Sequence, residues 1–184
     1  MAITIWLCGK ISLGEENMEK LTKTFFQKSA LEVAPLLLGK LLCRNVNGEI
    51  IKYRITDLEV YYGSCDTACH AHKGKTPRNK VMFESGGVCY VYLCYGIHYL
   101  FNIVTGPKDH PEGIMIRGIE GVDGPGRVTK ALKIDKSLYG VSIESDLVWV
   151  EDDGFKAEYT TAPRIGIDYA TEEDINKPWR FIVK

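Results

Sequence analysis

The dipeptide Asn47-Gly48 restricts the fold more than any other feature, because it separates two long runs with the composition of β-strands. Asn and Gly accept the positive φ angles of a type I′ turn, which joins adjacent antiparallel strands with only two residues. We therefore predict a β-hairpin with strands at residues 40–46 and 49–61.

The rest of the chain adds short strands and few helices. The further predicted elements are strands at 88–94, 99–104, 113–120, 146–151 and 179–183, and helices at 30–38 and 125–134. Strands and helices do not alternate, and the chain has no dinucleotide fingerprint, phosphate loop or nucleophile elbow. This order favours an α+β or mainly β domain over a doubly wound parallel sheet.

Length and composition are those of one intracellular domain. A chain of 184 residues, 45% of them hydrophobic, can bury one substantial core. Its six cysteines lack the spacing of a disulfide scaffold, and no segment is apolar enough to span a membrane. Residues 1–17 do not have the features of a signal peptide. We expect an N-terminal extension at 1–17 that need not be ordered, one domain at 18–184, and a reducing compartment, the cytoplasm in a prokaryote.

Charge is distributed unevenly along the chain. The formal net charge is only −1, yet residues 20–136 carry 17 Lys and Arg against 11 Asp and Glu, whereas residues 137–184 carry 5 against 10. Phosphate attraction is local, since salt screens charges beyond about 8–10 Å. The distribution permits a nucleic-acid partner bound through one basic face, although many enzymes are equally uneven.

Three side chains that can do chemistry share one face of the first hairpin. Residues two apart on a strand project to the same side, so Asp57, Glu59 and Tyr61 are predicted to project together. Spacing alone fits either a site or a solvated strand residue beside half-buried packing. Arg117 is the lone charge in an apolar strand, and if it faces inward it needs a partner such as Glu59.

The segment between the hairpins, residues 62–80, is polar and contains Gly and Pro, and it is predicted to be a long ordered loop or a set of short helices. Residues 65–72 include two Cys and two His, but they lack the second ligand pair of a structural zinc site, so we expect no metal. Residues 72–80 carry four positive charges and no acid, which suits either a phosphate contact or a solvated basic loop.

The second predicted hairpin is crowded with tyrosines, and Tyr95 stands beside Gly96 at its tip. Tyrosine in a strand usually packs into the core, which accounts for Tyr90. A ring held out by a tight turn instead suits insertion into a base stack, at the gap that an extruded nucleotide leaves. We therefore predict that Tyr95 is an exposed wedge.

Separated motifs along the chain resemble the alkyladenine (3-methyladenine) DNA glycosylase family. The matching segments are Leu58-Glu59-Val60-Tyr61-Tyr62-Gly63, His70, Thr76-Pro77-Arg78-Asn79, Tyr90-Val91-Tyr92, Tyr95-Gly96, Asn102, Arg117, Gly124-Pro125-Gly126-Arg127 and Pro178-Trp179-Arg180-Phe181. The resemblance extends over residues 24–183, and several motifs in order are more specific than any one alone. It implies a single compact α+β domain with a curved, mainly antiparallel, open-barrel-like sheet, surrounding helices and a protruding β-hairpin.

The resemblance implies a hydrolytic role for Glu59. Glu59 would be the general base that deprotonates a water as it attacks the sugar C1′, and Arg117 and the main chain near Val128 would help to hold that water. The activity implied is DNA base-excision repair, in which a damaged purine is flipped out of duplex DNA and its N-glycosidic bond is hydrolysed, leaving an abasic site. The resemblance implies no metal, cofactor or catalytic lysine, and thus a monofunctional enzyme.

The resemblance also implies the binding residues. Tyr61, His70 and Tyr92 would form the walls of the base pocket, and Asn102 would discriminate against the exocyclic amino group of guanine. The residues implied to contact DNA are Tyr95, Gly96, Lys73, Lys75, Thr76, Arg78 and Asn79. The expected partner is duplex DNA that contains damaged purines, bound by a monomer without a membrane.

A non-catalytic nucleic-acid-binding domain is the main alternative, since aromatic and basic surfaces also serve binding without chemistry. Glu59 distinguishes the two functions. A carboxylate in a groove for an anionic ligand repels that ligand, so a protein that only binds has no use for it.

Overall fold

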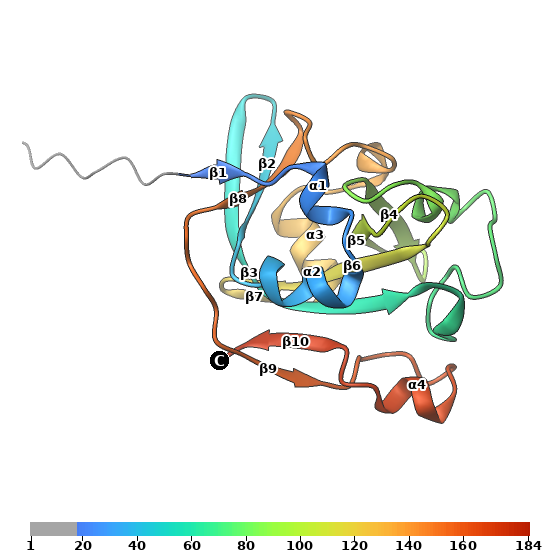
Figure 1. Ribbon diagram of the computed structural model, residues 1–184. Helices are drawn as coiled ribbons and strands as arrows, with labels where there is room; N and C mark the ends of the chain where they lie inside the picture. The colour runs from blue at the N-terminus through green and yellow to red at the C-terminus, as the bar shows by residue number, and fades with distance from the viewer. Residues whose placement is uncertain (1–17) are drawn as a thin grey trace, which may run out of the picture.

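The central strand of the fold is β3 (Glu49–Tyr62), as a computed structural model that describes residues 18–184 shows. Its first half pairs with β2 (Leu41–Val46), and its second half pairs with β6 (Glu112–Ile119) and with β10 (Arg180–Val183). In Figure 1 this strand runs through the middle of the molecule, with β9 and β10 on one side of it. The extension predicted at 1–17 lies outside the described residues.

The described strands form one open, ten-stranded sheet in which every pairing is antiparallel. Its main order is β1-β8-β2-β3-β6-β5-β4, and β7, β9 and β10 lie off this path. The remaining strands are β1 (Glu19–Lys20), β4 (Cys89–Cys94), β5 (His98–Thr105), β7 (Val122–Asp123), β8 (Val148–Asp152) and β9 (Tyr159–Ala162). Together with the four α-helices found within residues 18–184, this sheet confirms the predicted α+β class and the single domain.

The turn between β2 and β3 has the predicted geometry. Asn47 and Gly48 have φ angles of 54° and 93°, and the Gly48 N–H donates to Asn45 Oδ1 at 2.9 Å. Both central residues of a type I′ turn need positive φ, which few residues other than Gly and Asn adopt readily. The turn fixes the register of the hairpin, with Val46 opposite Glu49.

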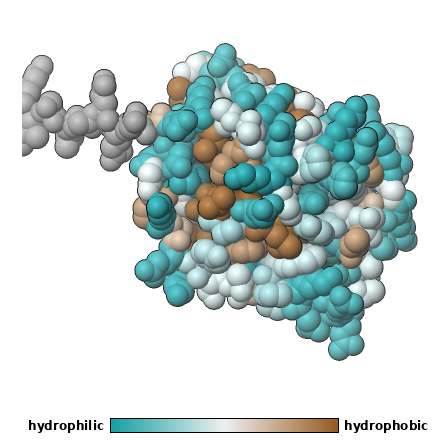
Figure 2. All heavy atoms as spheres, in the orientation of Figure 1, coloured by the Kyte–Doolittle hydropathy of each residue, from teal (hydrophilic) through white to brown (hydrophobic). Residues whose placement is uncertain are grey.

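The helices are short and cover parts of the sheet. They are α1 (Lys23–Phe26), α2 (Ala30–Leu37), α3 (Pro125–Ala131) and α4 (Glu172–Asn176). Before α2, the Ser29 N–H donates to the Glu32 carboxylate at 3.1 Å, half of a capping box, and Gly39 follows the helix with a φ of 84°. Val33 and Leu37 are fully buried, whereas Leu36 is exposed, and Figure 2 shows apolar side chains gathered over this region.

Two elements near the C-terminus were not predicted from the sequence, β9 and α4. They lie in the acidic part of the chain, where no periodic apolar pattern marks them. Among residues 18–184, no helix has both the length and the apolar composition needed to cross a membrane.

Candidate active site

The second half of β3 presents three functional side chains on one face of the sheet. Its pairing with β6 shifts register on either side of Asp57, as in a β-bulge. A Cβ at Gly118 on β6 would lie 2.9 Å from the Asp57 Cβ, so glycine there makes room for Asp57. Arg117 forms ion pairs with both Asp57 and Glu59, and Tyr61 donates to Glu59. The three side chains therefore share a face, as the strand spacing predicts.

Glu59 is fully buried, yet both of its carboxylate oxygens have partners. Oε1 accepts a hydrogen bond from the Ile165 N–H at 2.9 Å, and Oε2 accepts one from the Tyr61 hydroxyl at 3.0 Å. Burial raises the pKa of Glu59, although Arg117, the Ile165 N–H and the Tyr61 hydroxyl act in the opposite direction. The carboxylate is thus more basic than that of a solvated glutamate, which suits a group that takes up a proton.

Arg117 lies between two carboxylates. Its Nη1 is 3.5 Å from Glu59 Oε1, and its Nε is 3.7 Å from Asp57 Oδ2. Arg180, on β10, holds the same Asp57 more tightly, with Nε at 3.1 Å from both oxygens and Nη2 at 2.7 Å from Oδ2. Arg117 therefore faces inward and has Glu59 as a partner, as its place in an apolar strand predicted.

A buried ion pair fixes the segment that supplies the Ile165 N–H. Arg164 donates to the Asp66 carboxylate at 2.6 and 2.8 Å and to the Val60 carbonyl at 2.9 Å. Both side chains are completely buried, and Asp66 accepts two further backbone N–H groups. The pair ties the C-terminal segment to the end of β3 and so determines where Ile165 meets Glu59.

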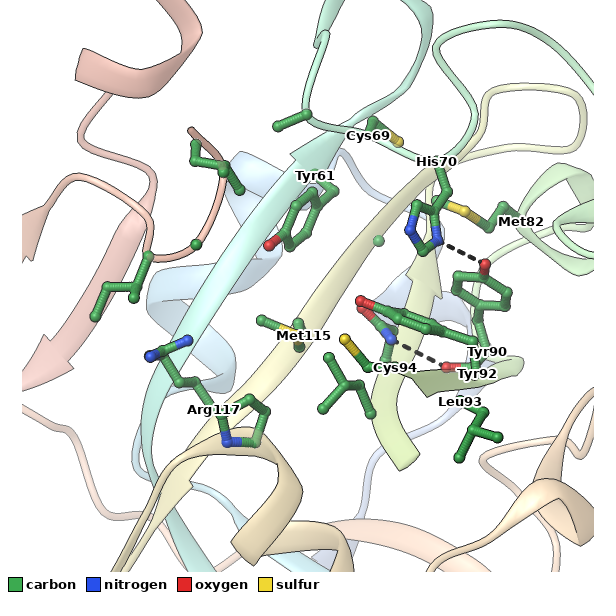
Figure 3. Close-up of a pocket in the computed structure, with 18 of the residues that line it drawn as sticks. Tyr61, Cys69, His70, Met82, Tyr90, Tyr92, Leu93, Cys94, Met115 and Arg117 are labelled. Atoms are coloured by element: carbon green, nitrogen blue, oxygen red, sulfur yellow. Dashed lines mark hydrogen bonds between the residues drawn. The ribbon is translucent and has the colours of Figure 1, made fainter. Parts of the chain in front are cut away.

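A cavity of about 680 Å³ opens beside this charged group. Tyr61 and Arg117 line the cavity and both contact Glu59. Its aromatic lining consists of Tyr61, His70, Tyr90, Tyr92, Tyr95 and Tyr169. Figure 3 shows Tyr61 on one side of the cavity and His70 and Tyr92 on the other. The volume is that of pockets that enclose small organic ligands.

The His70 ring is held at the cavity wall by two tyrosines. Its Nδ1 lies 2.8 Å from the Tyr90 hydroxyl (Figure 3), and its centroid lies 4.5 Å from that of Tyr92 in an edge-to-face contact. Desolvation and then the charge of Arg78 lower the pKa of His70. The ring is therefore neutral at neutral pH, with its second nitrogen left for another hydrogen bond.

Asn102 is anchored to the same wall. It lies on β5, is 5% exposed and lines the cavity, and its Nδ2 donates to the Tyr90 carbonyl at 3.1 Å. Because this bond uses one of the two amide N–H groups, it holds the side chain in one orientation at the cavity wall.

The tip of the β4–β5 hairpin holds Tyr95 out into solvent. Tyr95 is 93% exposed with a φ of 49°, and Gly96 has a φ of 72°. The Ile97 N–H donates to the Cys94 carbonyl at 3.1 Å and closes the turn. The Tyr95 ring is therefore exposed, as predicted. Tyr95 also helps to line the cavity.

The basic loop lies next to the cavity and has one buried member. Lys73, Lys75, Thr76 and Arg78 are exposed, and the Arg78 guanidinium lies 5.5 Å from the Tyr92 ring centroid. Asn79 is only 2% exposed. Its side chain donates to the carbonyls of residues 70 and 74 at 2.8 and 3.0 Å, so it shapes the loop from inside.

Val128 is not brought to the site. It is completely buried within α3, where its N–H donates to the Gly124 carbonyl and its carbonyl accepts from the Leu132 N–H. The main-chain contact to Glu59 comes instead from Ile165, more than thirty residues further along the chain. The physical reason is that α3 packs Val128 into the hydrophobic core, and the residue does not line the cavity.

Several site residues were missed by sequence reasoning, namely Asp66, Arg164, Ile165 and Tyr169. Tyr169 lines the cavity, is 68% exposed, and donates from its hydroxyl to the Ala68 carbonyl at 2.9 Å. Arg164 is followed by Ile165-Gly166-Ile167, so it carried the signal used for Arg117, a lone charge beside apolar residues. The Ile165 contribution is a backbone N–H, for which a sequence holds no signal.

The Cys and His residues of the loop do not converge. Within residues 18–184, no three or more His, Cys, Asp and Glu side chains are grouped so that they could hold a metal ion. Cys69 is buried, which raises the pKa of its thiol to about 11, and its Sγ accepts from the Ala71 N–H. His72 instead lies 2.8 Å from the Ser64 carbonyl through its Nδ1.

Comparison with known proteins places these features in a family. The family described as Methylpurine-DNA glycosylase (MPG) matches residues 24–124 and 120–184. A protein of Psychrobacter cryohalolentis is 42% identical over 178 residues, which cover 80% of this chain and 84% of the relative. A protein of Borrelia garinii subsp. bavariensis is 41% identical over 174 residues, which cover 87% of this chain and 94% of the relative. A protein of Natranaerobius thermophilus is 40% identical over 190 residues, which cover 90% of this chain and 96% of the relative.

All three relatives carry the name "Putative 3-methyladenine DNA glycosylase". The match spans nearly the whole described domain and includes the strands that carry Glu59, Tyr61, Asn102 and Arg117. The resemblance inferred from separated motifs is thus confirmed, and the chain belongs to the methylpurine-DNA glycosylase family.

Proposed function

We propose that this chain is a monofunctional DNA glycosylase that hydrolyses the N-glycosidic bond of an alkylated purine, with Glu59 as the general base. One observation carries the proposal: a fully buried carboxylate, paired with Arg117, adjoins an aromatic cavity. Burying a carboxylate costs free energy, and a surface that only binds an anion gains nothing from it. A reaction that needs a proton acceptor does gain from it.

In the proposed reaction, Glu59 takes one proton from a water molecule while the water oxygen bonds to the sugar C1′. The bond between C1′ and the purine nitrogen breaks, and its electron pair leaves with the purine. Arg117 lines the cavity 3.5 Å from Glu59 Oε1, so its remaining N–H groups would orient the water. The products are a free purine base and an abasic site in the DNA.

A purine alkylated at N3 or N7 is the substrate that this arrangement favours. Such a base carries a positive charge and departs as a neutral molecule, so the protein need not protonate it. Asp57, the other nearby carboxylate, accepts three hydrogen bonds from Arg180. Both of its oxygens therefore act as acceptors, and we do not assign it the role of a proton donor. The mechanism therefore assigns no general acid, which limits it to bases that leave without one.

The cavity suits a flat, cationic base. Tyr61 on one side and His70 and Tyr92 on the other present aromatic rings (Figure 3), and the faces of such rings attract cations. His70 is neutral because its pKa is lowered, so it adds no repelling charge. Asn102, fixed by the Tyr90 carbonyl, would exclude bases with a bulkier exocyclic group at that wall.

Binding to duplex DNA would use the hairpin tip and the basic loop. Tyr95 beside Gly96 would fill the gap left by the flipped nucleotide, and the exposed Lys73, Lys75, Thr76 and Arg78 would contact the backbone. Asn79 would act by holding the loop in shape. A monomer would be sufficient, since the whole cavity is lined by one chain.

The Tyr95→Ser variant tests the wedge. We expect weaker binding to duplex DNA with an abasic site, by about 1–3 kcal/mol, because a stacking ring is lost. The free energy of unfolding should stay within about 0.5 kcal/mol of wild type, since the ring is almost fully exposed. Leu147→Ser, at an exposed apolar residue outside the cavity lining, is the control. Equal affinities of both variants for the abasic duplex would remove the wedge from the proposal.

The reaction class is tested by incubating the protein with alkylated duplex DNA and identifying the products by chromatography and mass spectrometry. We expect free alkylated purines, 3-methyladenine among them, and DNA strands that break only after alkaline treatment. Undamaged duplex is the control. Direct strand breakage by the protein, or no released base, would contradict a monofunctional glycosylase.

A further inference from the structure

Four charged side chains of alternating sign stand in a row on one face of the sheet. In order, they are Arg180 on β10, Asp57 on β3, Arg117 on β6 and Glu59 on β3. Their side chains range from fully buried at Glu59 to 21% exposed at Arg180. Charges this poorly solvated interact more strongly than surface charges, so each one affects its neighbours.

The contacts along this row are unequal. Arg180 approaches Asp57 to 2.7 Å, the distance of a direct charge-assisted hydrogen bond, and contacts both of its oxygens. Arg117 stays 3.7 Å from Asp57 and 3.5 Å from Glu59, beyond that distance on both sides. Arg117 is thus shared between two carboxylates, and Glu59 does not have a full ion pair.

Arg117 also has space on both sides. It lines the aromatic cavity and a second cavity of about 610 Å³, whose walls include Asp57 and Arg180. The guanidinium can therefore shift along the row without displacing core side chains. If Asp57 did not attract it, Arg117 could close on Glu59 and occupy the N–H groups that would hold the water.

We propose, on the basis of the function proposed above, that Asp57 is a positioning residue. Held by Arg180, it keeps Arg117 from forming a full ion pair with Glu59, so that Glu59 remains able to take a proton from water. Arg180 acts in the opposite direction, because by binding Asp57 it limits how far Asp57 can draw Arg117 away from Glu59.

The charges around Glu59 predict opposite effects on its pKa for the removal of Asp57 and the removal of Arg180. The groups that face Glu59 are Asp57 and Tyr61 from β3, Arg117 from β6, Arg180 from β10, and Arg164 and the Ile165 N–H from the C-terminal segment. The negative charge of Asp57 raises the pKa of Glu59, and the positive charge of Arg117 lowers it. Removing Asp57 should therefore lower this pKa, and removing Arg180 should raise it.

The test is single-turnover base release from alkylated duplex DNA, measured against pH for wild type, Asp57→Asn, Arg180→Gln and Glu59→Gln. A general base must be ionised, so the rate rises as pH passes the pKa of Glu59. In Asp57→Asn this rise should move to lower pH and reach a plateau roughly threefold to tenfold lower, because a weaker base accelerates less. In Arg180→Gln it should move to higher pH. Asp57→Glu should restore the wild-type profile.

A merely structural role would give a different result. Rates that fall while the rise stays at the wild-type pH, or shifts of both variants in the same direction, would overturn the inference. Thermal unfolding shows which variants fold, and if Asp57→Asn does not, the direction of the Arg180→Gln shift decides. The proposed function fails in a separate way, through Glu59→Gln retaining the wild-type rate, and that result would overturn both.

Discussion

The two sides of the cavity differ in charge and in how they are built. On one side, Arg117 lines the cavity and is paired with the buried Glu59, and neighbouring strands of the sheet place both charges. The other carries His70 and Tyr92, uncharged rings placed by a loop and by the exposed hairpin (Figure 3). We call these the charged wall and the aromatic wall.

This difference separates the two tasks of a hydrolytic enzyme. Fixed charges act strongly only where water is excluded and positions are rigid, which a sheet paired on both sides provides. Recognition of a flat base needs polarizable surface rather than charge, and segments outside the sheet interior can supply it. Substitutions in the charged wall should therefore alter stability and pH dependence, whereas those in the aromatic wall should alter binding.

The largest effect is expected where the support of the charged wall is broken. Arg164→Met leaves Asp66 fully buried without its cation, which should lower the free energy of unfolding by about 3–5 kcal/mol. Urea denaturation at neutral pH measures it. Asp146→Asn, which removes a surface ion pair with Lys20 at an N···O distance of 4.0 Å, should cost less than about 1 kcal/mol. Similar losses for the two variants would show that the buried pair does not support this wall.

An intermediate effect is expected in the aromatic wall. Tyr92→Ala removes one stacking ring, which should weaken binding of a lesion-containing duplex by about 1–3 kcal/mol. The pH at which base release rises should move little, since Tyr92 is not among the strongest influences on the pKa of Glu59. Fluorescence anisotropy and the pH–rate profile measure the two quantities. A displaced profile with unchanged affinity would reverse the roles assigned to the walls.

The smallest effect is expected from a single hydroxyl. Tyr61→Phe keeps the ring but removes the hydrogen bond that lowers the pKa of Glu59, so this pKa should rise and base release should begin at higher pH. Tyr90→Phe removes a hydroxyl that contacts His70 instead, and should leave the profile in place. If both variants behave alike, the Tyr61 hydroxyl does not tune Glu59.

Local features of the fold could be predicted because their causes lie in neighbouring residues. The Asn47-Gly48 turn and the exposed Tyr95 each follow from backbone preferences within a few positions. The pairing of Arg117 with Glu59 also followed, because a charge in an apolar strand requires a counter-charge. The family could be recognised because several separated motifs occur in the expected order, which is more specific than any one of them.

The parts that could not be predicted depend on distant backbone atoms. The Ile165 N–H reaches Glu59 only because Arg164 is pinned by Asp66, nearly one hundred positions earlier in the chain. Backbone groups are alike in every residue, so nothing in the sequence marks the one that meets a side chain. The expectation for Val128 shows the same limit, since its main-chain role was assigned by position while α3 packs the residue into the hydrophobic core.

The central claim is that Glu59 serves chemistry and not binding. Its most direct test compares wild type with Glu59→Gln in single-turnover base release and in affinity for the same alkylated duplex. We predict that the rate of base release falls by roughly 10²-fold or more, while affinity is unchanged or slightly higher because a negative charge is removed. Release of 3-methyladenine by Glu59→Gln at the wild-type rate would contradict the account.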